Sequence, residues 1–156
     1  MGKNGKVDIK GLENFRNNIE KNLGSNQVNL FLESCAKELA ARLLAKVIKR
    51  TPVGQYPSSS GKKGGTLRRG WTGEKSQSAS AYAQSLKVHH FGGVYVIEIV
   101  NPVEYASYVE FGHRTRGGDG WVEGKFMLTI SEQEIERDAP KILENKLKKK
   151  LGECFK

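Results

Sequence analysis

One long amphipathic helix dominates the pattern of hydrophobic and polar positions. From Val28 onward, apolar residues recur every three or four positions, which is the spacing of one face of an α-helix. The pattern predicts a helix from there to about Lys49. It ends at Thr51-Pro52, because the residue before a proline avoids the helical region. The apolar face consists of Val28, Phe31, Leu32, Cys35, Leu39, Leu43 and Val47. A shorter stripe predicts a preceding helix and consists of Leu12, Phe15, Ile19 and Leu23.

A β-hairpin is predicted in the second half of the chain. The segments 87–91 and 94–100 flank Gly92-Gly93, a pair that can adopt the positive φ angles of a two-residue turn. The second segment is rich in β-branched residues, as is typical of a central strand. Asn101 and Pro102 then predict the start of a short helix, Val103 to Phe111, which ends at Gly112.

A long C-terminal helix is predicted from Phe126. Pro140 predicts a kink or a break near Asp138, because proline cannot donate the helical hydrogen bond. The predicted buried side of this helix consists of Ile130, Ile135, Ile142, Leu147 and Leu151. Two glycine-rich segments, 52–66 and 112–124, predict loops that are mobile in the isolated subunit. Residues 76–85 carry only weak signals.

These elements predict an α+β fold in a single domain of residues 1–156. A small antiparallel sheet of three or four strands, including one β-hairpin, packs against a long N-terminal helix, a short helix and a long C-terminal helix. Such a sheet cannot cover the long helix on every side, so one helix face or one sheet edge remains for a partner. The low share of hydrophobic residues, 37%, also favours a subunit that completes its burial against neighbours.

The net positive charge of the chain indicates which classes of partner it can bind. The formal net charge is +9, and residues 1–103 contain sixteen Lys and Arg against seven Asp and Glu. Such an excess favours nucleic acid, an anionic surface or acidic proteins as partners. The first residues lack the apolar segment of a signal peptide, and no apolar stretch is long enough for a membrane helix. We therefore expect no membrane partner.

The sequence offers little for catalysis or for cofactor binding. His89 and His90 are neighbours in a predicted strand, so their side chains point to opposite faces. Neither cysteine has the spacing of a metal or redox motif, and no HExxH or phosphate-binding loop occurs. Glu110, His113 and Asp119 support only a weak hypothesis of a metal-dependent nuclease. We expect no catalytic residue, no metal and no cofactor.

A basic nucleic-acid-binding protein of phage origin is the alternative hypothesis. Lys62, Lys63, Arg68 and Arg69 precede Trp71, and cationic groups beside an aromatic ring can contact phosphates and stack on bases. An acidic protein neighbour would explain the same residues equally well. Binding to nucleic acid would weaken steeply with salt.

Two stretches carry a resemblance to a known family. One is NPVEYASYVEFGHRTRGG, followed by WVEGKFML, and the other is KRTPVG with GGTLRRGW after an insert. They resemble the bacteriophage tail-component family, the tail-completion or head–tail joining proteins of long-tailed phages. Phe126 stands at the family's Pro-Phe segment, although Lys125 replaces the proline.

The resemblance implies a structural protein without catalysis. Members assemble as a ring, commonly six-fold, at the head-proximal end of the tail, around the passage for DNA. The implied partners are other copies of the chain, a connector or adaptor, and tail-terminator or tail-tube proteins, with DNA at most in transit. The implied location is the virion neck, after assembly in the cytoplasm of the bacterial host.

The interface residues that we predict are aromatic and charged, as is typical of subunit contacts. Glu110 and Arg114 are expected to pair, either across a subunit boundary or along the helix end. Tyr105 and Tyr108 are alternatively core residues. The full predicted interface consists of Arg68, Arg69, Trp71, Tyr105, Tyr108, Glu110, Phe111, His113, Arg114, Arg116 and Trp121.

Overall fold

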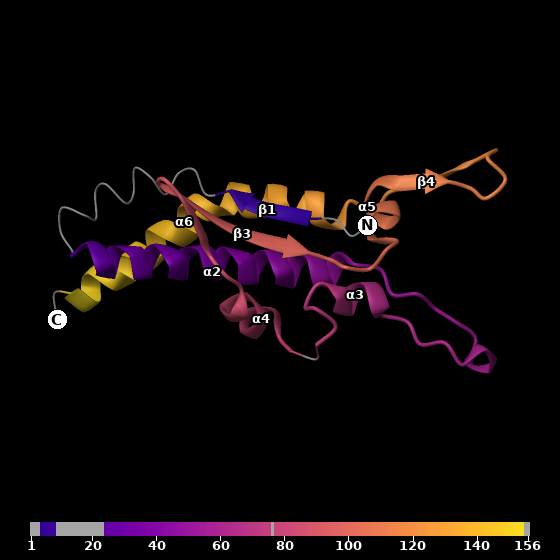
Figure 1. Ribbon diagram of the computed structural model, residues 1–156, viewed down its shortest axis with the longest axis horizontal. Helices are drawn as coiled ribbons and strands as arrows, with labels where there is room; N and C mark the ends of the chain where they lie inside the picture. The colour runs from indigo at the N-terminus through magenta and orange to yellow at the C-terminus, as the bar shows by residue number, and fades with distance from the viewer. Residues whose placement is uncertain (1–3, 9–23, 76, 155–156) are drawn as a thin grey trace.

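Helix α2 is the central element of the fold. The computed structural model describes residues 4–8, 24–75 and 77–154. α2 runs from Ser25 to Arg50 and buries the predicted apolar face along its whole length. It contacts α4, α6 and the central strand of the sheet, so its neighbours surround it on several sides (Figure 1). The predicted stop at Thr51 is confirmed, since Thr51 has an extended backbone. The helix predicted at residues 12–23 lies outside the described residues.

The larger sheet has three antiparallel strands in the order β1–β3–β2. β2 (His89–Phe91) and β3 (Val94–Val100) form the predicted hairpin, and β3 is the central strand as expected. Of the two turn glycines only Gly92 has a positive φ, 61°, so the turn is not the type I′ turn that the glycine pair would allow. Strand β1 (Asn4–Asp8), which we did not predict, pairs with β3.

Helix α6 (Met127–Cys154) lies antiparallel to α2, and ion pairs join the two helices along their length. Lys146 pairs with Glu38 at 2.7 Å, and Lys46 pairs with Glu134 at 2.8 Å. Arg50 also binds Glu134. Hydrogen bonds from Lys46 and Arg50 lower the pKa of Glu134 to about 2.

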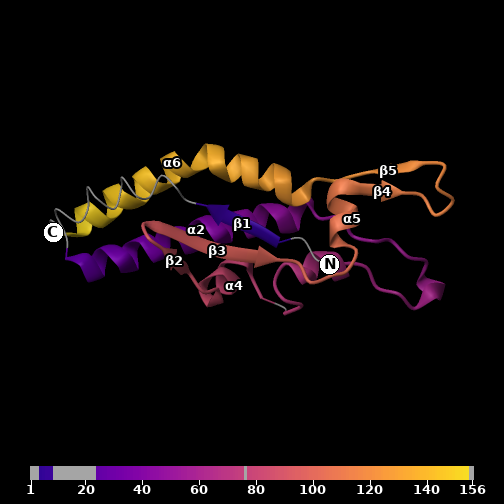
Figure 2. The ribbon, with the colours of Figure 1, turned by 45° about the horizontal axis from the view of Figure 1, so that its top comes forward.

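The C-terminal helix follows its prediction only in part. Of the kink or break predicted at Pro140, the break is wrong, because α6 continues through Pro140; the helix is visibly bowed (Figure 2). The expected buried side is only partly correct, because Ile135 is buried whereas Ile130 is exposed.

Short helical segments complete the body: η1 (Ser58–Ser60), α3 (Thr66–Gly70), α4 (Ala79–Ser85) and α5 (Ala106–Phe111). α4 occupies a segment with weak sequence signals, and Ser78 caps it by accepting the N–H of Ala81 at 3.1 Å. α5 begins three residues later than predicted. Its expected cap, Asn101, is buried, and its amide donates to the carbonyl of Leu67 at 2.8 Å, which holds the chain in a turn before the helix.

Residues 112–124 are the largest departure from the sequence analysis. We expected a loop, but β4 (Gly112–Arg114) and β5 (Trp121–Glu123) form a second, two-stranded antiparallel sheet. The predicted end of α5 at Gly112 is confirmed, with φ 86°. The fold class is α+β, as predicted, with a small antiparallel sheet, two long helices and a short one.

Candidate functional site: two arms at one end

Two segments project from the same end of the molecule. The loop arm comprises residues 52–65, with η1 at its tip, and the hairpin arm comprises residues 112–124 (Figures 1 and 2). The last turns of α6 lie at the opposite end (Figure 1). Residues 52–63 and 114–123 are all exposed. Segments that stand this far from the core are poorly supported alone and are available to neighbours.

The base of the loop arm is fixed by Thr51. The hydroxyl of Thr51 donates to the carbonyl of Val47 at 2.6 Å and accepts the indole N–H of Trp71 at 2.7 Å. Its carbonyl accepts two hydrogen bonds from the guanidinium of Arg68, at 2.8 and 3.2 Å. The residue that ends α2 is therefore joined to α3 and to the residue after it, so both ends of the arm are held together.

A close backbone contact reinforces that base. The side chain of Asn101 is buried between α3 and the turn after β3, where it also accepts the N–H of Val103 at 3.2 Å. Gly70 permits this packing, since a Cβ there would lie 2.2 Å from the side-chain oxygen of Asn101. A residue larger than glycine would separate α3 from the sheet.

The base of the hairpin arm depends on Glu110, which is fully buried. One oxygen of its carboxylate accepts the N–H of Leu128 at 2.9 Å. The other accepts the N–H and the hydroxyl of Thr129, at 2.9 and 2.7 Å. These N–H groups belong to the first turn of α6 and have no helical acceptor, so Glu110 caps α6 from another helix. A carboxylate is also favoured there by the helix dipole.

The backbone closes the same junction. Lys125 and Phe126 donate their N–H groups to the carbonyls of Val109 and Glu110, at 2.7 and 3.0 Å. Gly124 is required there, because a Cβ would lie 2.4 Å from the carbonyl oxygen of Glu110. Phe126 has a φ of 45°, which is costly for an aromatic residue and is held by these contacts. The hairpin arm therefore leaves α5 and enters α6 through one rigid junction.

Five exposed aromatic side chains surround this junction, and we call them the aromatic rim: Tyr105, Tyr108, Phe111, Trp121 and Phe126. The rings of Phe111 and Phe126 meet edge to face at 6.4 Å. At roughly 200 Å² per aromatic side chain, about half of it exposed, the rim leaves on the order of 500 Å² of aromatic surface in solvent. Exposed aromatic side chains gathered near one junction are the residue types that are enriched in protein interfaces.

The charged residues of this end serve different purposes. The guanidinium of Arg69 donates to the carbonyl of Gly64 at 3.3 Å, within the loop arm. Arg114 and Arg116 are exposed on the hairpin arm. The ring of His113 contacts that of Tyr108 at 5.8 Å, and its Nδ1 is buried without a hydrogen-bond partner.

The geometry offers no support for the metal hypothesis. Glu110 is occupied in capping α6, and Asp119 lies in the exposed turn of the hairpin arm. Over residues 4–8, 24–75 and 77–154, no three His, Cys, Asp or Glu side chains are placed to hold a metal ion. In the same part of the chain, no helix has the length and apolarity required to cross a bilayer.

The structure separates the predicted interface residues into two groups. Trp71 and Glu110 are fully buried, so they cannot contact a partner directly; they support the arms from within. Glu110 does not pair with Arg114, because its oxygens face α6. The others are at least partly exposed, and their part in an interface stays a prediction: Arg68, Arg69, Tyr105, Tyr108, Phe111, His113, Arg114, Arg116 and Trp121.

Sequence reasoning missed two features of the site. Phe126 was assigned to the start of a helix and to the family's Pro-Phe segment but not to the predicted interface, whereas it is exposed beside Phe111 and completes the aromatic rim. The capping role of Glu110 had a signal that went unused, since Ala106 and Glu110 lie four residues apart on one helical face. An acidic residue on an apolar face needs buried donors, and these come from α6.

Comparison with known proteins places the chain in a family. The family model of bacteriophage HK97 gp10-like tail components matches residues 13–112, well over half of the chain. The match includes α2 to α5 and ends where the hairpin arm begins. No curated protein and no solved structure matches the chain. The match confirms the resemblance seen in the sequence: the chain belongs to the HK97 gp10-like family of bacteriophage tail components, and it is a structural protein of the phage virion.

Proposed function

We propose that the chain is a tail-completion, or head–tail joining, subunit of the phage neck. Copies of it form a ring, with six as the expected number, at the head-proximal end of the tail and around the DNA passage. One face of the ring meets a connector or adaptor, and the other meets the tail terminator or tail tube. The observation that carries the proposal is the pair of arms with the aromatic rim at one end of a tail-component fold.

The physical support lies in how the arms are built. Their bases are rigid, through Thr51 at one arm and Glu110 at the other, whereas the arms themselves are exposed. A rigid base limits the entropy that is lost on docking, while exposed arms supply contact area beyond the body of the subunit. A closed ring repeats each weak contact, which makes the whole assembly strong.

A genetic experiment tests the position in the virion. A phage that lacks the chain is expected to accumulate DNA-filled heads and separate tails, which electron microscopy counts directly. Adding the purified protein to such a lysate should restore joined virions. A Tyr105→Ala, Tyr108→Ala double variant should restore far fewer, whereas Phe91→Ala, a matched loss of an exposed aromatic side chain on β2, should restore as many as the natural chain. Normal numbers of joined virions without the chain would contradict the proposal.

The nucleic-acid alternative retains one favourable observation, the exposed Lys62 and Lys63 on the loop arm. It loses part of its basis elsewhere, because Arg68 and Arg69 donate to backbone carbonyls of their own chain. Filter binding of double-stranded DNA at low and moderate salt separates the two proposals. Retention that falls steeply with salt would favour DNA binding. An absence of retention even at low salt would eliminate it.

A further inference from the structure

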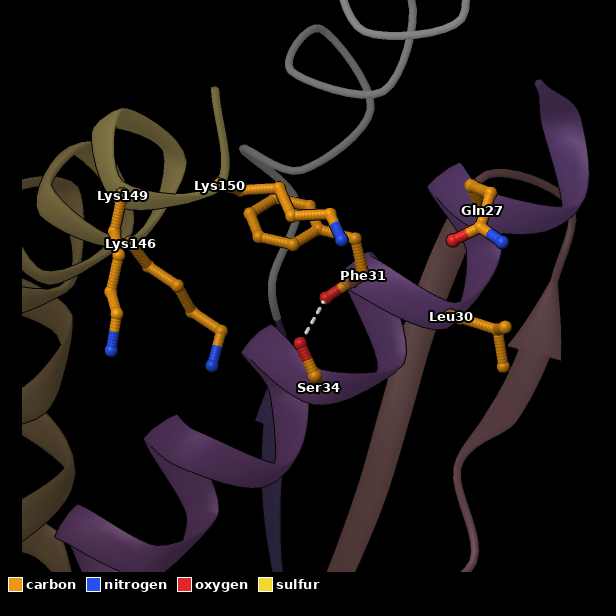
Figure 3. Close-up of a pocket in the computed structure, with 7 residues that line it drawn as sticks. All are labelled: Gln27, Leu30, Phe31, Ser34, Lys146, Lys149 and Lys150. Atoms are coloured by element: carbon orange, nitrogen blue, oxygen red, sulfur yellow. Dashed lines mark hydrogen bonds between the residues drawn. The ribbon is translucent and has the colours of Figure 1, made fainter. Parts of the chain in front are cut away.

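A groove of about 300 Å³ lies between the first turns of α2 and the last turns of α6, at the end of the molecule opposite the arms (Figures 1 and 3). α2 lines one side of the groove, where Leu30 has 54% of its surface exposed. Three lysines of α6, Lys146, Lys149 and Lys150, line the other side (Figure 3). Lining the whole groove are Gln27, Leu30, Phe31, Ser34, Lys146, Lys149 and Lys150.

The charge of this groove is only partly compensated. Lys146 pairs with Glu38. Lys149 and Lys150 form no ion pair with any of the described residues. The groove thus combines an apolar wall with two cations that are open to an acidic partner, and an aromatic residue flanked by carboxylates would complement both.

The hairpin arm has that chemistry. Trp121 is 55% exposed, and Glu123 lies on the same face of β5, because side chains two residues apart in a strand point the same way. Asp119 precedes the strand in the exposed turn. Arg114 lies opposite Trp121 on β4 and is itself exposed. Trp121 and Glu123 therefore share one face of the arm with Arg114, and Asp119 adds a second carboxylate in the turn before β5.

The hairpin arm also has little support of its own. Each of its strands has three residues, every residue of β5 is exposed, and the arm packs mainly against α5. Isolated two-stranded hairpins are marginally stable in water. Val122, on the other face of β5, is exposed as well, so both faces carry apolar surface. Docking against a neighbour would bury it.

We propose that the hairpin arm of one copy docks into the α2–α6 groove of a second copy. Trp121 covers Leu30, and the carboxylates of Asp119 and Glu123 face Lys149 and Lys150. Donor and acceptor lie at opposite ends of an elongated molecule, so the contact uses two different surfaces, the type that closes rings when the rotation permits. This inference rests on the proposed function and names the contact between its subunits.

Complementation between two defective variants tests the contact by sedimentation velocity. Trp121→Ala removes the donor and keeps the groove, whereas Leu30→Asp disrupts the groove and keeps the donor. Both positions are about half exposed, so both variants should keep the circular dichroism of the natural chain. Each alone should associate at least tenfold more weakly than the natural chain. An equimolar mixture should form a one-to-one dimer and nothing larger, because only one intact arm and one intact groove remain. Phe91→Ala is the control and should assemble normally.

The possible outcomes distinguish a failure of this contact from a failure of the proposed ring. If either variant assembles like the natural chain, or if the mixture stays monomeric, the groove does not receive the hairpin arm, while a ring with another contact survives. Assembly lost in Leu30→Asp but kept in Trp121→Ala would indicate that a different segment of the second copy occupies the groove, and would overturn the inference. A natural chain that is monomeric at every concentration would refute both the contact and the ring.

Discussion

The carboxylate of Glu110 connects α5 to α6, and removing it is the most direct test of how the hairpin arm is held. The change Glu110→Ala deletes the acceptor of three hydrogen bonds, from the N–H groups of Leu128 and Thr129 and from the Thr129 hydroxyl. It also leaves a small cavity, because the side chain is fully buried. Glu110→Gln keeps the size of the side chain but replaces one acceptor oxygen with an amide nitrogen, which is a donor.

The expected losses follow from these contacts. Losing a capping side chain costs about 0.5–2 kcal/mol, and hydrogen bonds to a charged group contribute about 1.5–3 kcal/mol. Because these terms overlap, we expect Glu110→Ala to lower the free energy of unfolding by about 3 kcal/mol. Glu110→Gln places its nitrogen against the N–H of Leu128 and should lose about 1.5 kcal/mol. For a chain of this length, the alanine variant should melt roughly 6–12 °C lower.

Thermal unfolding followed by circular dichroism measures the difference, at one protein concentration for all variants because assembly raises the melting temperature. Glu104→Ala is the matched control: it removes an exposed acidic residue near the same helix and should change the stability by less than about 0.5 kcal/mol. A loss below about 1 kcal/mol in Glu110→Ala, or an equal loss in Glu104→Ala, would refute the capping role.

Three further predictions concern single residues. Burial raises the pKa of the Cys35 thiol to about 12, so peptide mapping should find it unmodified by thiol reagents in the folded chain at pH 8 and modified after unfolding. In Trp71→Phe, Trp121 is the only indole of the chain. Its emission maximum should lie at long wavelength in the monomer, where the ring is exposed, and should shift to shorter wavelength on assembly. An emission maximum that does not change on assembly would count against burial of the hairpin arm. The pKa of Glu134 falls from its ordinary 4.5 to about 2 on folding. Its stabilising effect is therefore complete above pH 4.5 and lost as the pH falls towards 2, so the melting temperatures of the natural chain and of Glu134→Gln should differ above pH 5 and converge near pH 2.

Regular local patterns predicted much of the fold. α2 was evident because its apolar residues, Val28 to Val47, follow a helical period over about five turns, and Pro52 follows its C-cap Thr51. The β2–β3 hairpin was evident from two glycines between strand-like segments. Strand β1 was missed because Asn, Gly and Asp are poor strand formers. Its pairing is decided by β3, which lies far away in the sequence.

The site was harder to predict, because its contacts are not local. The segment 112–124 contains many glycines and reads as a loop, but two of them, Gly112 and Gly124, allow the backbones to approach closely at the base of a hairpin. Glu110 acts on residues eighteen and nineteen positions later, beyond the reach of helix-capping rules. Trp71 appeared to be a surface residue because arginines precede it, yet the hydroxyl of Thr51 satisfies its N–H inside the core.

The register of β1 has a consequence for how the chain folds. Its residues pair with residues of β3 that are about ninety positions later, from Asn4 with Val100 to Asp8 with Val96. Contacts between such distant positions form slowly, since a long loop must close before any of them is gained. The β2–β3 hairpin and α2 need no such closure, so the first strand to be synthesised is expected to be the last to join its sheet. A ribosome must therefore release the chain beyond Val100 before that edge of the sheet can form.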